Sequence, residues 1–177
     1  MSQLFDKAVL WSDIHFGLRG NSIEHNEMCL EYMQWMIDLA KSKGITTSIF
    51  MGDYFHNRAV INISTMNYGL RGMRLLNDNF EKTYFLVGNH DMYYRQKRDV
   101  TSVKFAEEFP NIVLISEITE IDDCLFVPFL VGDEWKSLEQ YNDKYVFGHL
   151  ELPGYKLNSL VEMPDHGKES ENSFSKC

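Results

Sequence analysis

The chain has 177 residues, which fits one domain with a buried core, and its composition is ordinary for a globular protein, with 44% hydrophobic and 24% charged residues. The net charge of −9 argues against a general nucleic-acid-binding protein, which is normally basic, but not against an enzyme that reaches phosphate groups through metal ions. No apolar run approaches the roughly 20 residues that a membrane span needs, and the N-terminus lacks the features of a secretion signal. Three well-separated cysteines without CxxC spacing indicate free thiols in a reducing cytoplasm.

Short apolar strands alternate with amphipathic helices over the first two thirds of the chain. We expect strands at 7–12, 46–51, 83–88 and 112–115, and helices at about 24–43, 64–77 and 101–109. The helix at 24–43 is expected to bury a stripe of Cys29, Met33, Met36, Ile37 and Ala40, widened by Tyr32, Trp35 and Leu39. Gly69 and Gly72 weaken the helix at 64–77, each by roughly 1 kcal/mol relative to Ala.

The pattern changes after residue 116. Residues 117–121 and 124–129 are predicted to form a hairpin, so we expect the sheets to be mixed rather than purely parallel. A short connection at 132–141 and a last strand at 144–148 follow, whereas residues 151–177 show no periodicity. We therefore predict an α/β fold with a catalytic domain over residues 1–150 and an irregular C-terminal segment over 151–177.

Four of the predicted strands end at Gly or Ser and run directly into metal-binding side chains. These side chains are Asp13 and His15, Asp53, Asn89, and His149. The carboxyl ends of strands in open α/β sheets point to one crevice, and Asp, Asn and His are ligands for divalent cations. Two cations would clamp a phosphate group between them, and Asp53 is the carboxylate best placed to bridge both. His90, directly after Asn89, is the expected proton donor to the leaving oxygen.

The segments Asp13-Ile14-His15, Gly52-Asp53-Tyr54-Phe55-His56, Gly88-Asn89-His90-Asp91 and Gly148-His149 together resemble the signature of the calcineurin-like metallophosphoesterases. Within that superfamily, the chain is most similar to the nuclease subunit of the SbcC/SbcD-type recombination and repair complex and to its phage recombination-endonuclease relatives. The resemblance covers residues 7–150. It implies a four-layer αββα sandwich, in which two mixed β-sheets pack face to face with helices outside.

The resemblance also implies roles for the site residues. Asp13, His15 and Asp53 would hold a first metal ion, and Asp53, Asn89 and His149 a second. His90 would protonate the departing sugar oxygen, and His56 would help to place the scissile phosphate. The family metal is typically Mn²⁺ and the substrate is DNA. The implied partners are a coiled-coil ABC ATPase of the SbcC type and a second copy of the nuclease subunit, in the cytoplasm of a bacterial cell or phage-infected host and without a membrane.

One family motif is missing from the sequence. The family closes its site with a Gly-His-x-His segment, whereas His166 has neither a preceding strand nor a second His. We therefore expect a C-terminally incomplete chain that is at most a weak nuclease. Two alternatives stay open, a phosphoesterase acting on small phosphodiesters or phosphoproteins and a non-catalytic remnant. The basic, aromatic run 93–98 favours DNA, and His25 is interpreted as a surface residue at a helix start.

Overall fold

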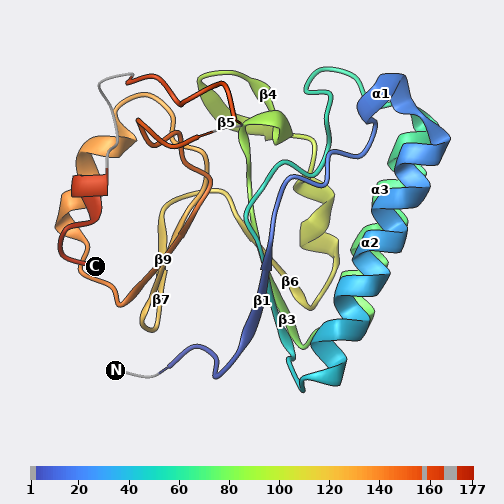
Figure 1. Ribbon diagram of the computed structural model, residues 1–177, viewed down its shortest axis with the longest axis horizontal. Coiled ribbons are helices and arrows are strands. Elements are labelled where there is room, and N and C mark those ends of the chain that lie inside the picture. Colours follow the sequence, from blue (N-terminus) through green and yellow to red (C-terminus); the bar gives the residue numbers. More distant parts are fainter. Residues whose placement is uncertain (1–2, 157–158, 166–170) are drawn as a thin grey trace.

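A computed structural model describes residues 3–156, 159–165 and 171–177, and these residues form two larger β-sheets packed between two helical layers and a separate two-stranded sheet (Figure 1). The first sheet has the strand order β1-β2-β3-β6, with strands Ala8–Trp11, Thr47–Phe50, Lys82–Leu86 and Ile112–Ile115. The second sheet contains β7 (Thr119–Ile121), β8 (Cys124–Val127) and β9 (Tyr145–Gly148). The predicted four-layer α/β sandwich is confirmed.

The two sheets differ in strand direction. All neighbouring strands of the first sheet are parallel, because helical segments carry the chain back between successive strands. In the second sheet, β7 is antiparallel to β8 while β9 is parallel to it. Among the described residues, only the second sheet is therefore mixed, and the expectation of two mixed sheets was wrong for the first. The hairpin of β7 and β8 was predicted correctly.

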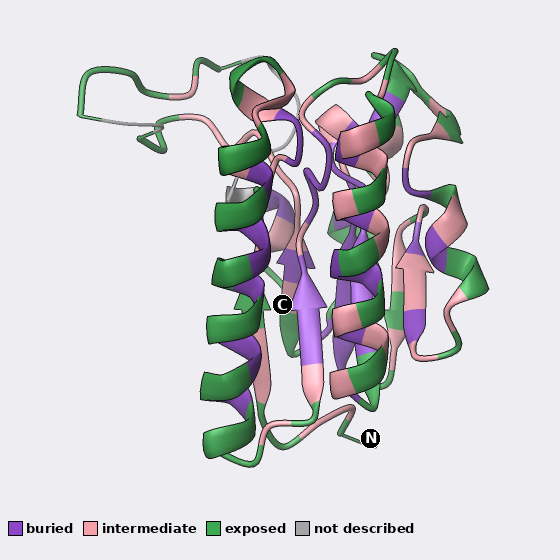
Figure 2. Ribbon diagram, turned by 90° about the vertical axis from the view of Figure 1, so that its right-hand side faces the viewer, coloured by how far each residue is buried: buried purple, intermediate pink, exposed green. Residues whose placement is uncertain are grey.

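Three apolar clusters lie between the four layers. The largest joins the first sheet to helices α2 (Ile23–Ser42) and α3 (Ile63–Asn79), which bury their sheet-facing sides (Figure 2). A second cluster lies between the sheets, with Tyr84, Phe126 and Phe147 at its centre. A third lies under η3 (Glu134–Gln140), a 3₁₀ helix on the outer face of the second sheet. Each layer is thus stabilised by apolar burial on the faces that meet its neighbours.

Helix α2 buries a narrower stripe than the sequence pattern predicts. Cys29, Met33, Met36, Ile37 and Ala40 are buried as expected. Tyr32, Trp35 and Leu39 are 41%, 59% and 40% exposed, so the predicted widening of the stripe was wrong. The sheet covers only one side of the helix, which leaves these three large side chains at the surface.

Residues 92–108 differ most from the prediction. Strands β4 (Met92–Tyr94) and β5 (Lys97–Thr101) form a separate antiparallel hairpin, whereas we predicted no strand between residues 88 and 112. The helix predicted at 101–109 is reduced to the 3₁₀ helix η2 (Lys104–Glu108), because β5 takes its first residue. Helical periodicity does not reveal which residues pair across two short strands, so the sequence pattern did not predict this hairpin. The Gly-rich loop after β1 also contains a short turn, α1 (Leu18–Asn21), in which Arg19 and Gly20 have left-handed backbone angles.

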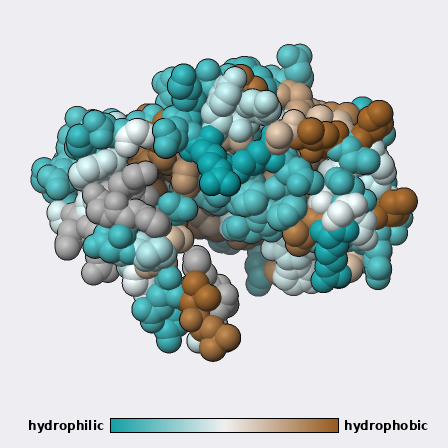
Figure 3. All heavy atoms as spheres, turned by 90° about the horizontal axis from the view of Figure 1, so that it is seen from above, coloured by the Kyte–Doolittle hydropathy of each residue, from teal (hydrophilic) through white to brown (hydrophobic). Residues whose placement is uncertain are grey.

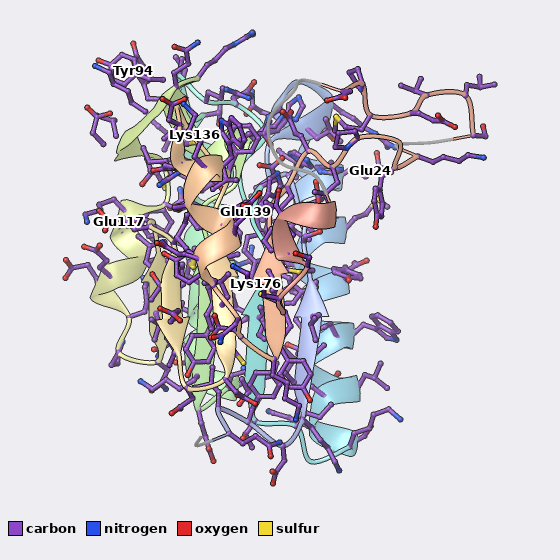
Figure 4. All side chains as sticks on the ribbon, turned by 90° about the vertical axis from the view of Figure 1, so that its left-hand side faces the viewer. Glu24, Tyr94, Glu117, Lys136, Glu139 and Lys176 are labelled. Atoms are coloured by element: carbon purple, nitrogen blue, oxygen red, sulfur yellow. The ribbon has the colours of Figure 1, made fainter. Side chains whose placement is uncertain are left out.

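The C-terminal residues lie against the outer 3₁₀ layer. Phe174, at the end of η4 (Glu171–Phe174), packs into the third apolar cluster, and Lys176 Nζ donates to the Glu139 carbonyl at 2.7 Å (Figure 4). His166, the weakest ligand candidate in the sequence, lies outside the described residues. Within the described ranges, none of the helices is both long and apolar enough to cross a membrane.

The two glycines of α3 allow the helix to approach the loop after β2. A Cβ atom at Gly69 would lie 2.5 Å from Cζ of the buried Phe55 ring, and one at Gly72 would meet the Tyr54 hydroxyl. That hydroxyl donates to the Gly69 carbonyl at 2.6 Å. The helix-weakening residues of the sequence are therefore positions of close packing.

Replacing Gly69 with Ala should destabilise the protein, although Ala is the better helix former by about 1 kcal/mol. Because Phe55 is fully buried, overpacking should lower the free energy of unfolding by about 1–3 kcal/mol. Urea denaturation followed by circular dichroism measures the change. The control is Asn67→Ala at an exposed position of the same helix, which should be neutral or stabilising. A stabilised Gly69→Ala variant would contradict the packing argument.

Candidate metal centre

Backbone hydrogen bonds join the loops that follow β1 and β2. The Asp13 amide donates to the Gly52 carbonyl at 3.0 Å, and the His15 amide donates to the Asp53 carbonyl at 3.1 Å. Asp13, His15 and Asp53 have φ angles of 57°, 49° and 65°, in the left-handed region that costs a non-glycine residue about 1–3 kcal/mol. Such strain persists where surrounding contacts impose it, and it clusters at functional sites. Here it turns three predicted ligands toward one another.

Asp13, His15 and Asp53 form the first group of predicted ligands. One ligand atom from each lies within 4.8 Å of the others. His15 Nε2 is 3.5 Å from Asp13 Oδ1 and 3.6 Å from Asp53 Oδ2, and Asp53 is almost fully buried. These separations are too long for good hydrogen bonds. They suit ligand atoms that surround a common cation at about 2.0–2.2 Å each.

The charges of this group shift the pKa values of its members. Interaction with the His15 imidazole lowers the pKa of Asp13 to about 2, against burial, which raises it. Burial lowers the pKa of His15, but Asp13 and Asp53 together outweigh it, so the pKa of His15 is raised. Asp13 is therefore ionised at neutral pH, as a cation ligand must be.

Asn89 and His149 meet the other side of Asp53. His149 Nε2 lies 3.6 Å from Asp53 Oδ1 and 2.8 Å from Asn89 Oδ1. His149 Nδ1 lies 2.8 Å from the Met51 carbonyl and can only donate to it, which leaves Nε2 with a lone pair toward the site. The structure thus brings all five predicted metal ligands to the same end of the sheets.

The Asn89 amide provides a test of whether these residues fit a cation. In one orientation its oxygen faces both Asp53 carboxylate oxygens, and its nitrogen faces Arg58 Nη2, which also can only donate. Turned by 180°, the nitrogen donates to Asp53 at 3.2 Å and the oxygen accepts from Arg58 at 3.0 Å. A cation between Asp53, Asn89 and His149 would satisfy the first orientation, because it would separate acceptors that otherwise repel. Carboxylate, amide and imidazole donors of this kind suit a divalent cation, and the second orientation satisfies the same groups through hydrogen bonds alone.

His90 and His56 lie beside the first group rather than in it. Their rings stack with centroids 5.3 Å apart, and each ring also packs edge-on against His15. His90 Nδ1 lies 2.6 Å from the His56 carbonyl, and the His90 amide donates to Asp53 Oδ1 at 2.8 Å. Burial and the neighbouring imidazoles lower the pKa of His56, which favours its neutral form. The three imidazoles also form a second compact group that could hold an ion.

Asp91 has a structural role that the sequence analysis did not assign. Its fully buried carboxylate accepts from the amides of Asp53, Tyr54, Phe55 and Gly88 at 2.9, 2.9, 3.2 and 3.0 Å. Burial raises the pKa of Asp91 to about 6, and the amide donors oppose that rise. A short acidic side chain directly after Gly-Asn-His was the available signal, but three of its four partners lie more than 30 residues away.

Glycine at position 88 allows the loops after β2 and β3 to come this close. A Cβ atom at Gly88 would collide with the backbone nitrogen and carboxylate of Asp53. The Gly of the Gly-Asn-His segment is therefore required by the proximity of Asp53, not by a turn alone.

His25 also differs from its predicted role. Its ring is half-buried, with Nε2 3.1 Å from the His15 carbonyl and 3.4 Å from Cys29 Sγ. The interpretation as a surface residue was wrong, because α2 begins directly under the loop that carries His15. His25 thus supports the left-handed backbone of a predicted ligand. Burial raises the pKa of Cys29 to about 11, so this thiol is not a nucleophile at neutral pH.

Comparisons with known proteins place the chain in a family. The model of the calcineurin-like phosphoesterases matches residues 7–173, so the chain belongs to that family. It is similar to exonuclease subunit 1 of Enterobacteria phage T4, with 26% identity over 172 residues that cover 92% of this chain and 50% of the relative. The chain thus spans about half the length of this relative.

A solved structure supports the same fold. The nuclease MPE of Pseudomonas putida superposes with a TM-score of 0.52 at 17% identity, over 89% of this chain and 67% of that chain. The predicted resemblance to calcineurin-like phosphoesterases is confirmed.

Replacing Asp91 with Asn should destabilise the loops that carry Asp53 and Asn89. An amide keeps one acceptor oxygen but turns its NH₂ group toward backbone donors, so the free energy of unfolding should fall by about 2–4 kcal/mol. Denaturant titration at pH 7.5 measures this loss. Asp99→Asn, at an exposed position of the neighbouring hairpin, is the matched control and should change stability by less than about 0.5 kcal/mol. Equal stability of the two variants would refute the assigned role of Asp91.

Proposed function

We propose that the chain is the catalytic part of a metal-dependent phosphodiester hydrolase that cleaves DNA with two divalent cations, Mn²⁺ being the expected metal. The observation that carries this proposal is the position of the Asp53 carboxylate. Its Oδ2 faces His15 and its Oδ1 faces His149, each at 3.6 Å, so one buried carboxylate joins the two predicted ligand groups. We assign this role to the domain over residues 1–150.

Five residues would hold the cations. Asp13, His15 and Asp53 would take the first, and Asp53, Asn89 and His149 the second. When bound, two cations supply an activated water and neutralise the charge that develops on the phosphate. The residues of the chain keep both positions in place, since Asp91 holds the Asp53 backbone and Met51 orients the His149 ring.

His90 is proposed to deliver the proton to the leaving sugar oxygen. Its Nδ1–H is held by the His56 carbonyl, so Nε2 is the atom left to exchange a proton with substrate. Its ring contacts His15 while its amide donates to Asp53, which places it at the edge of the predicted cluster. His56, stacked on His90 and kept neutral, would position the phosphate.

The hairpin of β4 and β5 supports DNA as the substrate. Tyr93 and Tyr94 are 47% and 48% exposed and pack edge-on with centroids 4.8 Å apart, and Tyr94 projects from the top of the fold (Figure 4). Arg95 and Lys97 are exposed on the same hairpin. Exposed aromatic rings stack on bases while basic groups contact the backbone phosphates. The end of the molecule above the sheets is largely hydrophilic (Figure 3). A phosphoesterase for small substrates would need no such projecting hairpin.

The exposed surface of α2 bears on how the protein assembles. Met28, Tyr32, Trp35 and Leu39 are exposed and recur at helical spacing, so they form one apolar stripe along the helix. Such a stripe is typical of a protein interface, and it supports the proposed homodimer. The name of the T4 relative describes one subunit of an exonuclease. We also propose a coiled-coil ABC ATPase of the SbcC type as a partner, and the cytoplasm of a bacterial cell or phage-infected host as the location.

Two substitutions separate a metal ligand from a proton donor. Asp53→Asn should abolish Mn²⁺ binding, because both cation positions depend on this carboxylate. His90→Asn should keep Mn²⁺ binding but lower the rate of DNA hydrolysis by about 10²-fold or more. Isothermal calorimetry measures the first effect, and cleavage of labelled single- and double-stranded DNA the second. Loss of Mn²⁺ binding in His90→Asn would make His90 a ligand and overturn this assignment.

The apolar stripe of α2 predicts self-association. Trp35→Glu should shift the protein from dimer to monomer, because a charge at the centre of an apolar interface is left unpaired. Light scattering after gel filtration measures the mass. Gln34→Glu adds the same charge beside the stripe and should leave the mass unchanged. A monomeric parent protein would exclude the homodimer for this chain.

A further inference from the structure

An open recess of about 730 Å³ lies directly beside the predicted metal centre. Its walls include His56, Asn57, Arg58, Val60, Asn62 and His90. Its volume falls in the range of roughly 300–1,000 Å³ that is usual for small-molecule sites. None of its described lining residues is acidic, whereas the adjoining cluster contains Asp13 and Asp53. The recess is therefore a separate chemical environment at the same end of the fold.

Arg58 lies where the recess meets the metal centre. Its Nη2 is 3.0 Å from the terminal amide of Asn89, and its side chain lines the recess. If the Asn89 oxygen turns toward a cation, the Asn89 nitrogen faces Arg58, and two donors then face each other. The guanidinium must find another acceptor in that state. A phosphate oxygen at the metal centre is such an acceptor, and guanidinium is well suited to bind it.

The walls of the recess suit a nucleoside. Asn57 and Asn62 carry amide groups that can donate and accept, as the edges of bases require. Val60 is 75% exposed and offers an apolar surface for the face of a base. Asn62 also accepts from the Ser64 amide as the N-cap of α3, which fixes this wall to a long helix. Amides with an apolar surface and one cation match a nucleoside beside a phosphate better than an acidic phosphopeptide.

The position of His90 indicates which part of the substrate would occupy the recess. A proton donor must contact the leaving oxygen, and His90 lines the recess while its backbone contacts Asp53. We propose that the recess binds the nucleoside that departs with the leaving oxygen, and that Arg58 binds a non-bridging oxygen of the scissile phosphate. This inference rests on the proposed function and makes it more specific. It restricts the substrate to nucleic acid with an unpaired nucleotide at the cleavage point.

Two phosphodiesters test the recess. Cleavage of dithymidine phosphate releases a nucleoside, whereas cleavage of bis(p-nitrophenyl) phosphate releases p-nitrophenolate, which is not a nucleoside. Ala59→Trp, at an exposed lining position, should fill the recess and raise the KM of dithymidine phosphate relative to that of bis(p-nitrophenyl) phosphate by tenfold or more. Arg58→Gln should raise both KM values together, because both substrates share the phosphate. Glu120→Trp, at an exposed position of β7 on the second sheet, controls for an added ring elsewhere.

A binding measurement separates failure of the recess from failure of the proposed function. A dinucleotide that contains 2-aminopurine, titrated with Ca²⁺ present, should change fluorescence with the parent protein and at least tenfold more weakly with Ala59→Trp. If the parent protein hydrolyses both phosphodiesters with Mn²⁺ but Ala59→Trp changes neither the KM ratio nor dinucleotide binding, the recess proposal is wrong and the hydrolase stands. If the parent protein binds the dinucleotide through the recess but hydrolyses neither ester, the recess site stands and the hydrolase is wrong.

Discussion

The candidate site depends on one buried carboxylate that is not among its predicted ligands. Asp91 accepts four backbone amides, three from the loop after β2 and one from Gly88 after β3. A fully buried carboxylate is costly unless donors surround it, so these loops cannot separate without exposing an unsatisfied charge. Asp53 is thereby held in a left-handed conformation that few residues adopt readily. Backbone contacts of the chain itself therefore hold the predicted ligand Asp53 in place.

The sheet explains why distant residues meet. Four parallel strands of similar length end at one edge, and the second sheet brings β9 and His149 to the same end. Apolar clusters between the layers fix the sheets against each other, so the ligand positions inherit the rigidity of the core. The predicted ligands therefore lie on short loops, while the strands and the inner faces of the helices that position them are buried.

The parts proposed to contact substrate differ in construction from the predicted ligand cluster. Most residues of the β4–β5 hairpin and of the loop over residues 57–62 are exposed. They make fewer buried contacts, which suits surfaces that adapt to a partner. Arg58 and the Asn89 amide connect the two regions, because the orientation of that amide sets which acceptor the guanidinium finds. Cation binding and substrate contact would thus be linked through a single side chain.

Strand periodicity and strand-end motifs are local patterns, so the main strands and the types and order of the predicted ligands could be read from the sequence. It therefore predicted Asp13, His15, Asp53, Asn89 and His149 as one group, and these residues do meet. It could not determine the β4–β5 hairpin, the exposure of Trp35, or the roles of Asp91, His25 and Arg58. Each of these depends on which surface another element covers or on a partner distant in the chain. Contacts between residues far apart in the chain form only when the chain folds, and these contacts hold the predicted ligands in place.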